Sequence, residues 1–383
     1  MKASDAHIHF ACHRRLEELE RYLADARVDR CALASLPDAH RIHFNPEALY
    51  AKMRLGRRCY ALGSLDYSAR LYPRLFPGEQ PDLAAQVDRL RRLGFDGLKV
   101  FLGKPGFQRQ VGWSLTEAPV ARALERAAAL GLPALIHVAE PPVFWTRGPL
   151  ADQQAPGYEE LQAQALAVLD RHQRLTVVFA HLLMMAHDLP RLGGILDAHP
   201  NALLDLAPGL YFYGELHRQA AEAREFLIRF RDRVLFGSDG FWSSPDYDAF
   251  PYSSPAENLQ RTRRLAYFLA TERELDNPFP YTREEQPRLR GLGLARSREG
   301  RRALRSILRD NFRRLFAEHP APVDPAACAR YAEQMGERAA RLVEQPAEGL
   351  APRAAGVRRA RELAQLAACF RRGPAAAAGA GPC

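Results

Sequence analysis

The stretch SDAHIHF, residues 4–10, has the pattern of a buried β-strand with two histidines on one face. Successive side chains of a strand alternate between its faces, so His7 and His9 lie on the same side, roughly 6–7 Å apart along the strand. Two imidazoles placed in this way can share one metal ion. Most H-x-H triplets are accidental, so the rest of the chain has to decide whether this pair binds a metal.

Seven further short apolar runs follow this stretch, and each is apolar on both faces, which is typical of a parallel sheet covered by helices. They are CALASL (31–36), CYALGSLD (59–66), GLKVFLG (97–103), ALIHVAE (134–140), LTVVFAH (175–181), ALLDLAPG (202–209) and VLFGSDG (234–240). The segments between them repeat apolar residues every three or four positions, as amphipathic helices do. Gly94 and Gly131 mark two helix ends. Eight such units in about 240 residues favour a closed (β/α)₈ TIM barrel, an α/β fold, over an open doubly wound sheet.

The pattern changes after residue 240. Residues 245–320 contain helical segments and the loop DNPFPYTREEQPRLRGLGL, and they end in RRALRSILRDNFRRLF. We interpret this last segment as the eighth barrel helix, delayed by an insertion after strand eight. The sequence therefore predicts a barrel domain over 1–320, a C-terminal helical extension over 321–372, and a disordered low-complexity tail over 373–383.

The amino-acid composition limits the kinds of partner and compartment that we expect for the chain. The formal charge of +9 comes from residues 283–314, with eleven Arg against four acids, and 353–372, with six Arg against one. Without aromatic interleaving or a binding motif, these stretches favour solvated helix faces over a nucleic-acid site. No apolar run is long enough to span a membrane, and no signal peptide precedes the first strand. Six cysteines without a C-x-x-C pair indicate reduced thiols in the cytoplasm. A homo-oligomer is left open.

Polar residues interrupt the apolar runs at one common end. In a (β/α)₈ barrel the chemistry lies at the C-terminal ends of the strands, and an unpaired charge or imidazole buried there costs several kcal/mol. Each residue has an ordinary structural explanation, such as a hydrogen-bonded core histidine or a turn aspartate. Those explanations do not account for the position of all these residues at the same end of their strands, whereas binding to one common partner does. The residues are His7, His9, Lys99, His137, His181 and Asp239.

The chain resembles the amidohydrolase superfamily, in its amidohydrolase-related branch, which also holds aminocarboxymuconate-semialdehyde-decarboxylase-like enzymes. The resemblance covers residues 3 to about 317 and rests on DAHIHF, GLKVF, GLPALIHVAE, VVFAHL, VLFGSDG and ILRDNFRRLF. It implies that one divalent metal, most often zinc, is bound by His7, His9, His137 and Asp239. It also implies that His181 is an acid–base or water-orienting group. Imidazoles and a carboxylate suit Zn²⁺, and Asp239 would take the proton of the attacking water.

Lys99 introduces a binuclear alternative. In binuclear relatives a lysine of the fourth strand is carboxylated and bridges two metals, and His137 and His181 would then hold the second ion. In the branch that this chain resembles, the lysine is commonly present without carboxylation, so we favour a single metal. The chain departs from many relatives at Leu183, where they have a glycine two residues after the histidine of strand six.

Aromatic residues in the loops predict a pocket for a small organic ligand. Trp145, Tyr211 and Trp242 are the candidates, although ordinary loop packing explains such residues equally well. The leading hypothesis is a metal-dependent hydrolase that uses an activated water on an amide, ester or lactone. One alternative is non-oxidative decarboxylation of a small aromatic or unsaturated acid. A protein that holds a metal without catalysis is the alternative from another class.

Overall fold

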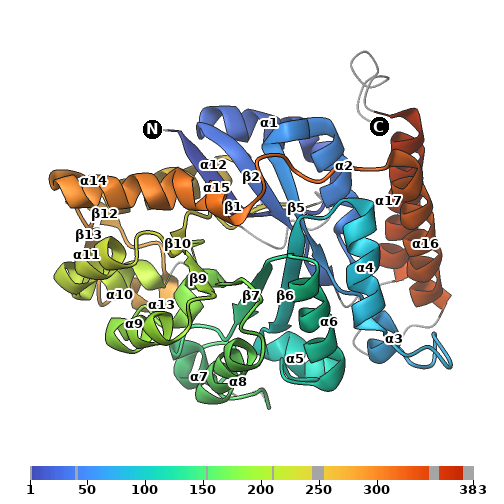
Figure 1. Ribbon diagram of the computed structural model, residues 1–383, viewed down its shortest axis with the longest axis horizontal. Coiled ribbons are helices and arrows are strands. Elements are labelled where there is room, and N and C mark those ends of the chain that lie inside the picture. The colour runs from blue at the N-terminus through green and yellow to red at the C-terminus, as the bar shows by residue number, and fades with distance from the viewer. Residues whose placement is uncertain are drawn as a thin grey trace.

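The parallel sheet that the sequence predicts is present and forms a barrel (Figure 1). The computed structural model describes residues 2–38, 42–151, 154–208, 211–243, 254–344 and 353–373, so the predicted tail lies outside it from residue 374 onward. Within these ranges nine strands make one parallel sheet in the order β10-β9-β8-β7-β6-β5-β2-β1-β11. The strands are β1 (Ala3–Phe10), β2 (Val28–Ala34), β5 (Cys59–Ser64), β6 (Gly97–Gly103), β7 (Ala134–Val138), β8 (Val177–Phe179), β9 (Ala202–Asp205), β10 (Val234–Leu235) and β11 (Gly240–Trp242).

The eighth strand is split, and its two parts close the barrel. β10 pairs with β9 on one side, and β11 pairs with β1 on the other. Between them, the Phe236 carbonyl accepts from Ala6 N at 2.9 Å, and Asp239 N donates to the His7 carbonyl at 2.8 Å. The prediction of a continuous strand over 234–240 is therefore wrong, because Asp239 occupies a turn between the two parts with φ of 52°. The (β/α)₈ fold itself is confirmed.

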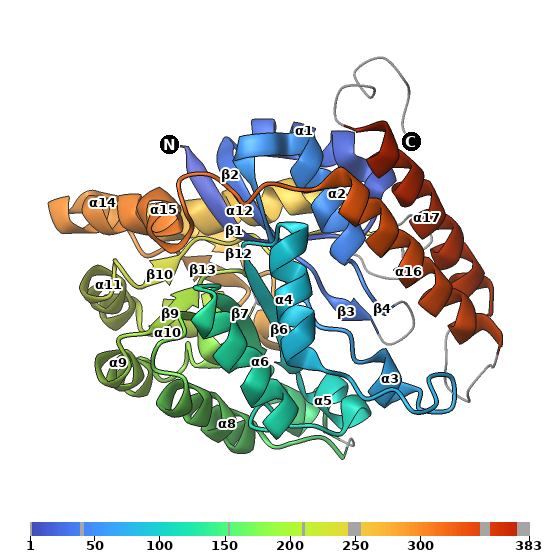
Figure 2. The same cartoon turned by 45° about the vertical axis from the view of Figure 1, so that its right-hand side comes forward.

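Helices cover the outside of the barrel (Figures 1 and 2). Asp82 caps the N-terminus of α4, and Gly94 ends that helix at φ of 97°, as the sequence predicts. The helices up to the eighth strand are α1 (Leu16–Asp25), α2 (Asn45–Leu55), α3 (Ser68–Leu71), α4 (Leu83–Leu93), α5 (Pro105–Val111), α6 (Ala118–Ala129), α7 (Val143–Arg147), α8 (Tyr158–Arg171), α9 (Leu189–Ala198), α10 (Phe212–Arg218) and α11 (Ala220–Arg229). None of the described helices is long and apolar enough to cross a membrane.

The insertion after the eighth strand contains more regular structure than the sequence predicts. It has α12 (Pro255–Ala270), α13 (Pro280–Arg283) and an antiparallel pair of strands, β12 (Glu274–Asp276) and β13 (Arg288–Arg290). This strand pair lies within and beside the segment that we predicted as a loop. The barrel then ends with α14 (Arg298–Arg305), a π-helical turn over Ser306–Asp310 and α15 (Asn311–Leu315). Two further helices, α16 (Pro325–Glu344) and α17 (Arg353–Arg372), pack against each other beside α2.

The barrel interior is closed by side chains at the N-terminal end of its strands. Tyr60 at the start of β5 packs against Phe312 and Phe316 from the region of α15, with ring centroids 5.3 and 4.9 Å apart. Alanine residues of β1 and β2 face the same cluster and leave room for these rings. Because this end is filled, polar side chains of the strands can meet only at the C-terminal mouth.

Candidate metal centre

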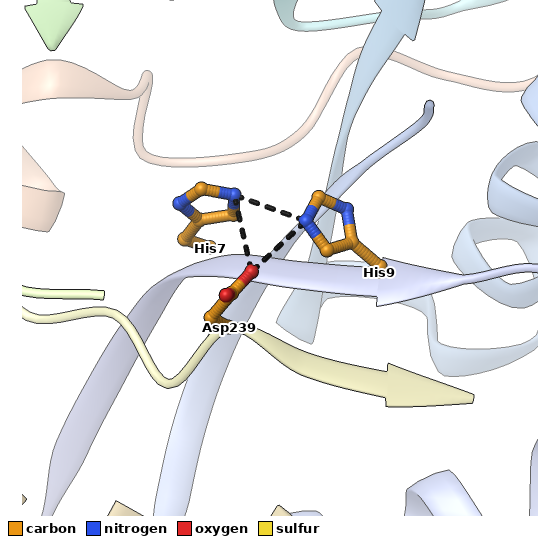
Figure 3. Close-up of side chains that lie close together, drawn as sticks. All are labelled: His7, His9 and Asp239. Carbon is orange, nitrogen blue, oxygen red and sulfur yellow. Dashed lines mark hydrogen bonds and ion pairs between the residues drawn. The ribbon is translucent and has the colours of Figure 1, made fainter. Parts of the chain in front are cut away.

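His7 and His9 leave β1 on the same face, as the strand geometry predicts, and they meet Asp239 at the barrel mouth (Figure 3). The Nε2 atoms of His7 and His9 lie 3.1 Å apart. Asp239 Oδ1 lies 3.1 Å from His9 Nε2 and 3.7 Å from His7 Nε2. These three potential ligand atoms lie within 4.8 Å of one another.

The outer nitrogen of each imidazole fixes its tautomer. His7 Nδ1 donates to Asp205 Oδ2 at 2.8 Å, and His9 Nδ1 donates to the Ala34 carbonyl at 2.6 Å. Carbonyl and carboxylate oxygens only accept, so the hydrogens are on Nδ1 and both Nε2 atoms carry lone pairs. Two lone pairs and a carboxylate oxygen thus face one another, an arrangement that a cation stabilises. The chemistry of this donor set fits a divalent metal.

The protonation states agree with metal ligation, which requires neutral imidazoles and an ionised carboxylate. Burial lowers the pKa of His7 to about 3, so its ring is neutral at pH 7. Burial acts to raise the pKa of Asp239, but its close contacts with the imidazoles of His9, His181 and His7 hold that pKa well below its usual range. The centre therefore has one fixed negative charge at Asp239.

The turn that carries Asp239 is tied to β1 by a second carboxylate. Asp5 Oδ1 accepts from His7 N at 3.1 Å and from Ser238 N at 3.0 Å. Tyr22 donates its hydroxyl to Asp5 Oδ2 at 3.0 Å. Since a non-glycine residue at positive φ is strained, these bonds hold Asp239 in a conformation that it would otherwise leave.

Asp205, at the end of β9, is a residue that the sequence reasoning missed. Its Oδ2 accepts from His7 Nδ1, and its Oδ1 accepts from His181 N at 2.8 Å and from Ala207 N at 3.0 Å. Burial acts to raise its pKa, but the bonds from His7 and His181 lower it to about 2. The same signal that identified the other residues was present, because Asp205 is a lone charge within the apolar run ALLDLAPG.

His181 follows β8 in a left-handed turn and faces the centre. His181, Leu182, Leu183 and Met184 all have φ between 53° and 57°. Leu183 therefore adopts a backbone conformation that a glycine, the residue of many relatives, would adopt without strain. His181 Nδ1 donates to the Ala207 carbonyl at 2.9 Å, which leaves a lone pair on Nε2. Its ring is stacked 5.3 Å from the ring of His7.

The ring of His137 contacts that of His181, which in turn is stacked on His7. The His137 ring is 5.1 Å from that of His181, and His137 Nε2 donates to the Ala139 carbonyl at 2.9 Å. Among the described residues, the close ligand groups are His7, His9 and Asp239, and His7, His181 and Asp205. The structure thus brings together three of the four predicted ligands, and it places His137 outside these two groups. Burial lowers the pKa of His137 to about 4, so this ring is also neutral.

A family model described as Amidohydrolase matches residues 4–317, which is more than half of the chain. The chain belongs to the amidohydrolase family. It is therefore an enzyme, as the sequence predicts. No curated protein matches the chain at a significant level.

Solved structures with low sequence identity resemble this amidohydrolase. A putative amidohydrolase from Staphylococcus aureus is 11% identical, with a TM-score of 0.51 over 82% of this chain and 99% of that chain. The manganese-bound 5-carboxyvanillate decarboxylase of Novosphingobium aromaticivorans is 13% identical, with a TM-score of 0.48 over 82% and 97%. A probable 2-pyrone-4,6-dicarboxylic acid hydrolase of Acinetobacter baumannii, with citric acid bound, is 14% identical, with a TM-score of 0.42 over 69% and 92%.

Lys99 lies beside the candidate metal centre of the amidohydrolase. Its Nζ is 3.1 Å from His7 Nε2, and burial lowers the pKa of its ammonium group to about 8. A second lysine, Lys104, follows β6 and contacts Glu140, whose Oε1 is 3.6 Å from His137 Nε2. The positive charge of Lys99 therefore acts on His7, and that of Lys104 acts on His137.

The three aromatic residues predicted for the pocket of the amidohydrolase lie in different environments. Trp145 is half-buried and donates its Nε1 to the Pro156 carbonyl at 3.2 Å. Tyr211 is buried, and its hydroxyl accepts from Ala186 N at 3.3 Å. Trp242 is fully buried, with its ring 4.7 Å from that of Tyr22. These contacts are those of packing residues, and a substrate role for any of the three stays a prediction.

Proposed function

We propose that the chain is a metal-dependent hydrolase that acts on an amide, ester or lactone of a small organic substrate. One divalent ion, with zinc as the first choice, would be held by His7, His9 and Asp239, and His137 would be the fourth ligand that the family resemblance implies. The observation that supports this most strongly is the meeting of His7 Nε2, His9 Nε2 and Asp239 Oδ1, with the two nitrogens 3.1 Å apart and both without a hydrogen.

The side chains around the proposed ion would have separate roles in the reaction. A divalent cation supplies Lewis acidity and lowers the pKa of a water to about 7. Asp239 is ionised and can accept the proton of the attacking water through its carboxylate. His181, with its lone pair on Nε2, can orient that water or exchange a proton with the leaving group. Asp205 holds His7 in the required tautomer through Oδ2 and binds the backbone nitrogen of His181 through Oδ1. The Ala207 carbonyl fixes the tautomer of His181.

Decarboxylation is the second candidate, and the position of Lys99 favours it. A buried ammonium group 3.1 Å from His7 Nε2 adds positive charge where a substrate carboxylate would approach the centre. A substrate carboxylate bound there could be lost as carbon dioxide in a non-oxidative decarboxylation. It could also remain unchanged while another bond of the substrate is hydrolysed. The two reactions share the same centre, so they have to be separated by their products.

Metal analysis and a substrate panel test this proposal. The protein is loaded with Zn²⁺ or Mn²⁺ and assayed on esters, lactones, amides and aromatic acids, with acid release followed by pH-stat and carbon dioxide by gas analysis. We expect acid release that a chelator abolishes, that added metal restores, and that Asp239→Asn lacks. Carbon dioxide release would support the decarboxylase instead. Stoichiometric metal without turnover on the whole panel would support a binding protein.

Cytoplasmic location is also part of the proposal. The buried free thiols among the described residues include Cys12, Cys31, Cys59 and Cys328. Free thiols are usual in a reducing compartment. A thiol titration of the denatured native-source protein, with six free thiols expected from the six cysteines, would test this.

A further inference from the structure

The two helices α16 and α17, which we name the C-terminal hairpin, lie outside the barrel and are not needed to close it. Figure 2 shows them packed along one side of the molecule, next to α2 and the short strands β3 (Pro37–Asp38) and β4 (Ile42–His43). The family match ends at residue 317, before the hairpin begins. The hairpin is thus an addition to the family fold whose contacts can indicate its role.

The hairpin holds residues 43–47 through buried polar groups. The side chains of Arg359 on α17 and Glu47 on α2 are each 1% exposed and form an ion pair. Arg359 also donates to the His43 carbonyl at 2.8 Å. The hydroxyl of Tyr331 on α16 lies 3.0 Å from His43 Nε2, and it accepts from Asn45 Nδ2 at 3.0 Å. Buried charges and hydrogen bonds of this kind fix one arrangement of the segment.

Residues 43–47 lie directly against the start of the loop that follows β2. β4 pairs with β3, and Phe44 N donates to the Leu36 carbonyl at 3.2 Å. Leu36 is two residues from Ala34, whose carbonyl accepts from His9 Nδ1. A short series of contacts therefore connects the hairpin with a predicted metal ligand through the loop after β2.

Asn45 connects the same segment with the barrel wall beside Lys99. Its Nδ2 donates to the Ser64 carbonyl, and its Oδ1 accepts from Ser64 N, both at 2.8 Å. Ser64 ends β5 and is the register partner of Lys99 on β6. Phe44 and Asn45 therefore attach the segment to the loop after β2 and to the end of β5.

A hollow of about 250 Å³ lies between the hairpin, α4 and the barrel, and none of His7, His9 and Asp239 lines it. Asp66 lines it from the barrel, Arg89 from α4, and Tyr331 and Arg338 from the hairpin. Arg338 is paired with Asp66 at 3.1 Å and with Glu79 at 2.7 Å, so it is a further link between the hairpin and the barrel.

We propose that the C-terminal hairpin positions part of the active site. Arg359 and Tyr331 are positioning residues that hold residues 43–47 and, through them, the loop after β2 beside His9. This inference rests on the proposed function for its kinetic consequences, whereas the positioning of the loop can be measured without turnover.

Tyr331→Phe tests the positioning role, because it removes one hydroxyl and keeps the packing of the ring. We expect faster backbone hydrogen exchange over residues 42–47, an unchanged affinity for Co²⁺, and KM raised about five- to tenfold with kcat within about twofold. Arg371→Met is the matched control, since Arg371 belongs to the same hairpin, is 58% exposed and pairs only at the surface with Glu333. This control should behave as the wild type in all three measurements.

A double variant keeps the test decisive. Arg359→Met alone leaves Glu47 buried and unpaired and would endanger folding, so it is combined with Glu47→Leu, which replaces the ion pair by apolar side chains. The double variant should fold and show the same faster exchange over residues 42–47.

Unchanged hydrogen exchange in Tyr331→Phe and in the double variant would overturn the positioning role. An unchanged KM in Tyr331→Phe, on a substrate that the wild type converts, would overturn the effect of the hairpin on the active site. A wild type that converts nothing would count against the proposed function, and the exchange measurement would still decide whether the hairpin positions the loop.

Discussion

Asp205→Asn separates the role of a positioning carboxylate from that of a simple packing residue. Asparagine keeps the shape of the side chain but replaces one acceptor oxygen by a donor NH₂ group. Asp205 accepts three hydrogen bonds, from His7 Nδ1 and from the backbone nitrogens of His181 and Ala207. In one orientation the new NH₂ faces His7 Nδ1 and drives the hydrogen of the imidazole to Nε2. In the other orientation it faces the two backbone donors, and both of their hydrogen bonds are lost.

The size of the effect follows from the loss of the His7 lone pair at the centre. Removal of a partner that orients a metal-bound histidine typically costs about 10- to 100-fold in metal affinity. This corresponds to about 1.4–2.7 kcal/mol of binding free energy. The variant should fold, because the side chain keeps its volume in a buried site.

Competition with a chromophoric chelator measures this change in Zn²⁺ affinity. Asp188→Asn is the matched control, because Asp188 caps α9 with its side chain and asparagine is an equally good cap. We expect the control to bind Zn²⁺ as the wild type does. A folded Asp205→Asn protein with wild-type Zn²⁺ affinity would refute the assignment of His7 as a ligand whose tautomer Asp205 fixes.

Three other predictions concern the histidines and Lys99. We expect His137→Ala to lose most of its bound metal, and His181→Ala to keep the metal and lose turnover, as measured by elemental analysis and the substrate panel; full metal occupancy in the first variant would exclude His137 as a ligand. Lys99→Met should retain one metal per chain, whereas a loss from two ions to one or none would indicate a carboxylated bridge. Burial lowers the pKa of His43 to about 4, so between that value and about 6.5 the unfolded state binds a proton that the folded state does not. The free energy of unfolding of the metal-free protein should therefore decrease as the pH is lowered, by about 2 kcal/mol at pH 5 from this group. Urea unfolding at pH 7.5 and at pH 5 should show a smaller decrease in His43→Gln than in the wild type.

The sequence predicts the fold well because apolar periodicity and helix termini are local signals. The eight strand segments and the C-terminal end of α4 at Gly94 follow from such signals, and the structure has them. The split of the eighth strand could not be predicted, because it depends on the pairing of residues 234–242 with strands on both sides. The strand pair β12–β13 was missed because prolines and glycines in that segment resemble a loop, whereas the antiparallel partner stabilises the extended backbone.

The candidate site was predictable to the extent that it consists of lone polar residues in apolar runs. His7, His9 and Asp239 come together as the strand positions require. The place of His137 depends on a bond between its Nε2 and the Ala139 carbonyl, which a linear pattern does not contain. The contact between the C-terminal hairpin and residues 43–47 joins positions that are about 300 residues apart, for example Glu47 and Arg359 with a separation of 312. No periodicity within a single segment reports such a contact.

The central claim is that His7, His9 and Asp239 bind one divalent ion at the barrel mouth. An anomalous difference map from a crystal of the Zn²⁺-loaded protein, recorded at the zinc absorption edge, measures this directly. We expect a single peak per chain at about 2.0–2.2 Å from His7 Nε2, His9 Nε2 and a carboxylate oxygen of Asp239. A peak at another place, or a fully loaded crystal with none between these three side chains, would contradict the claim.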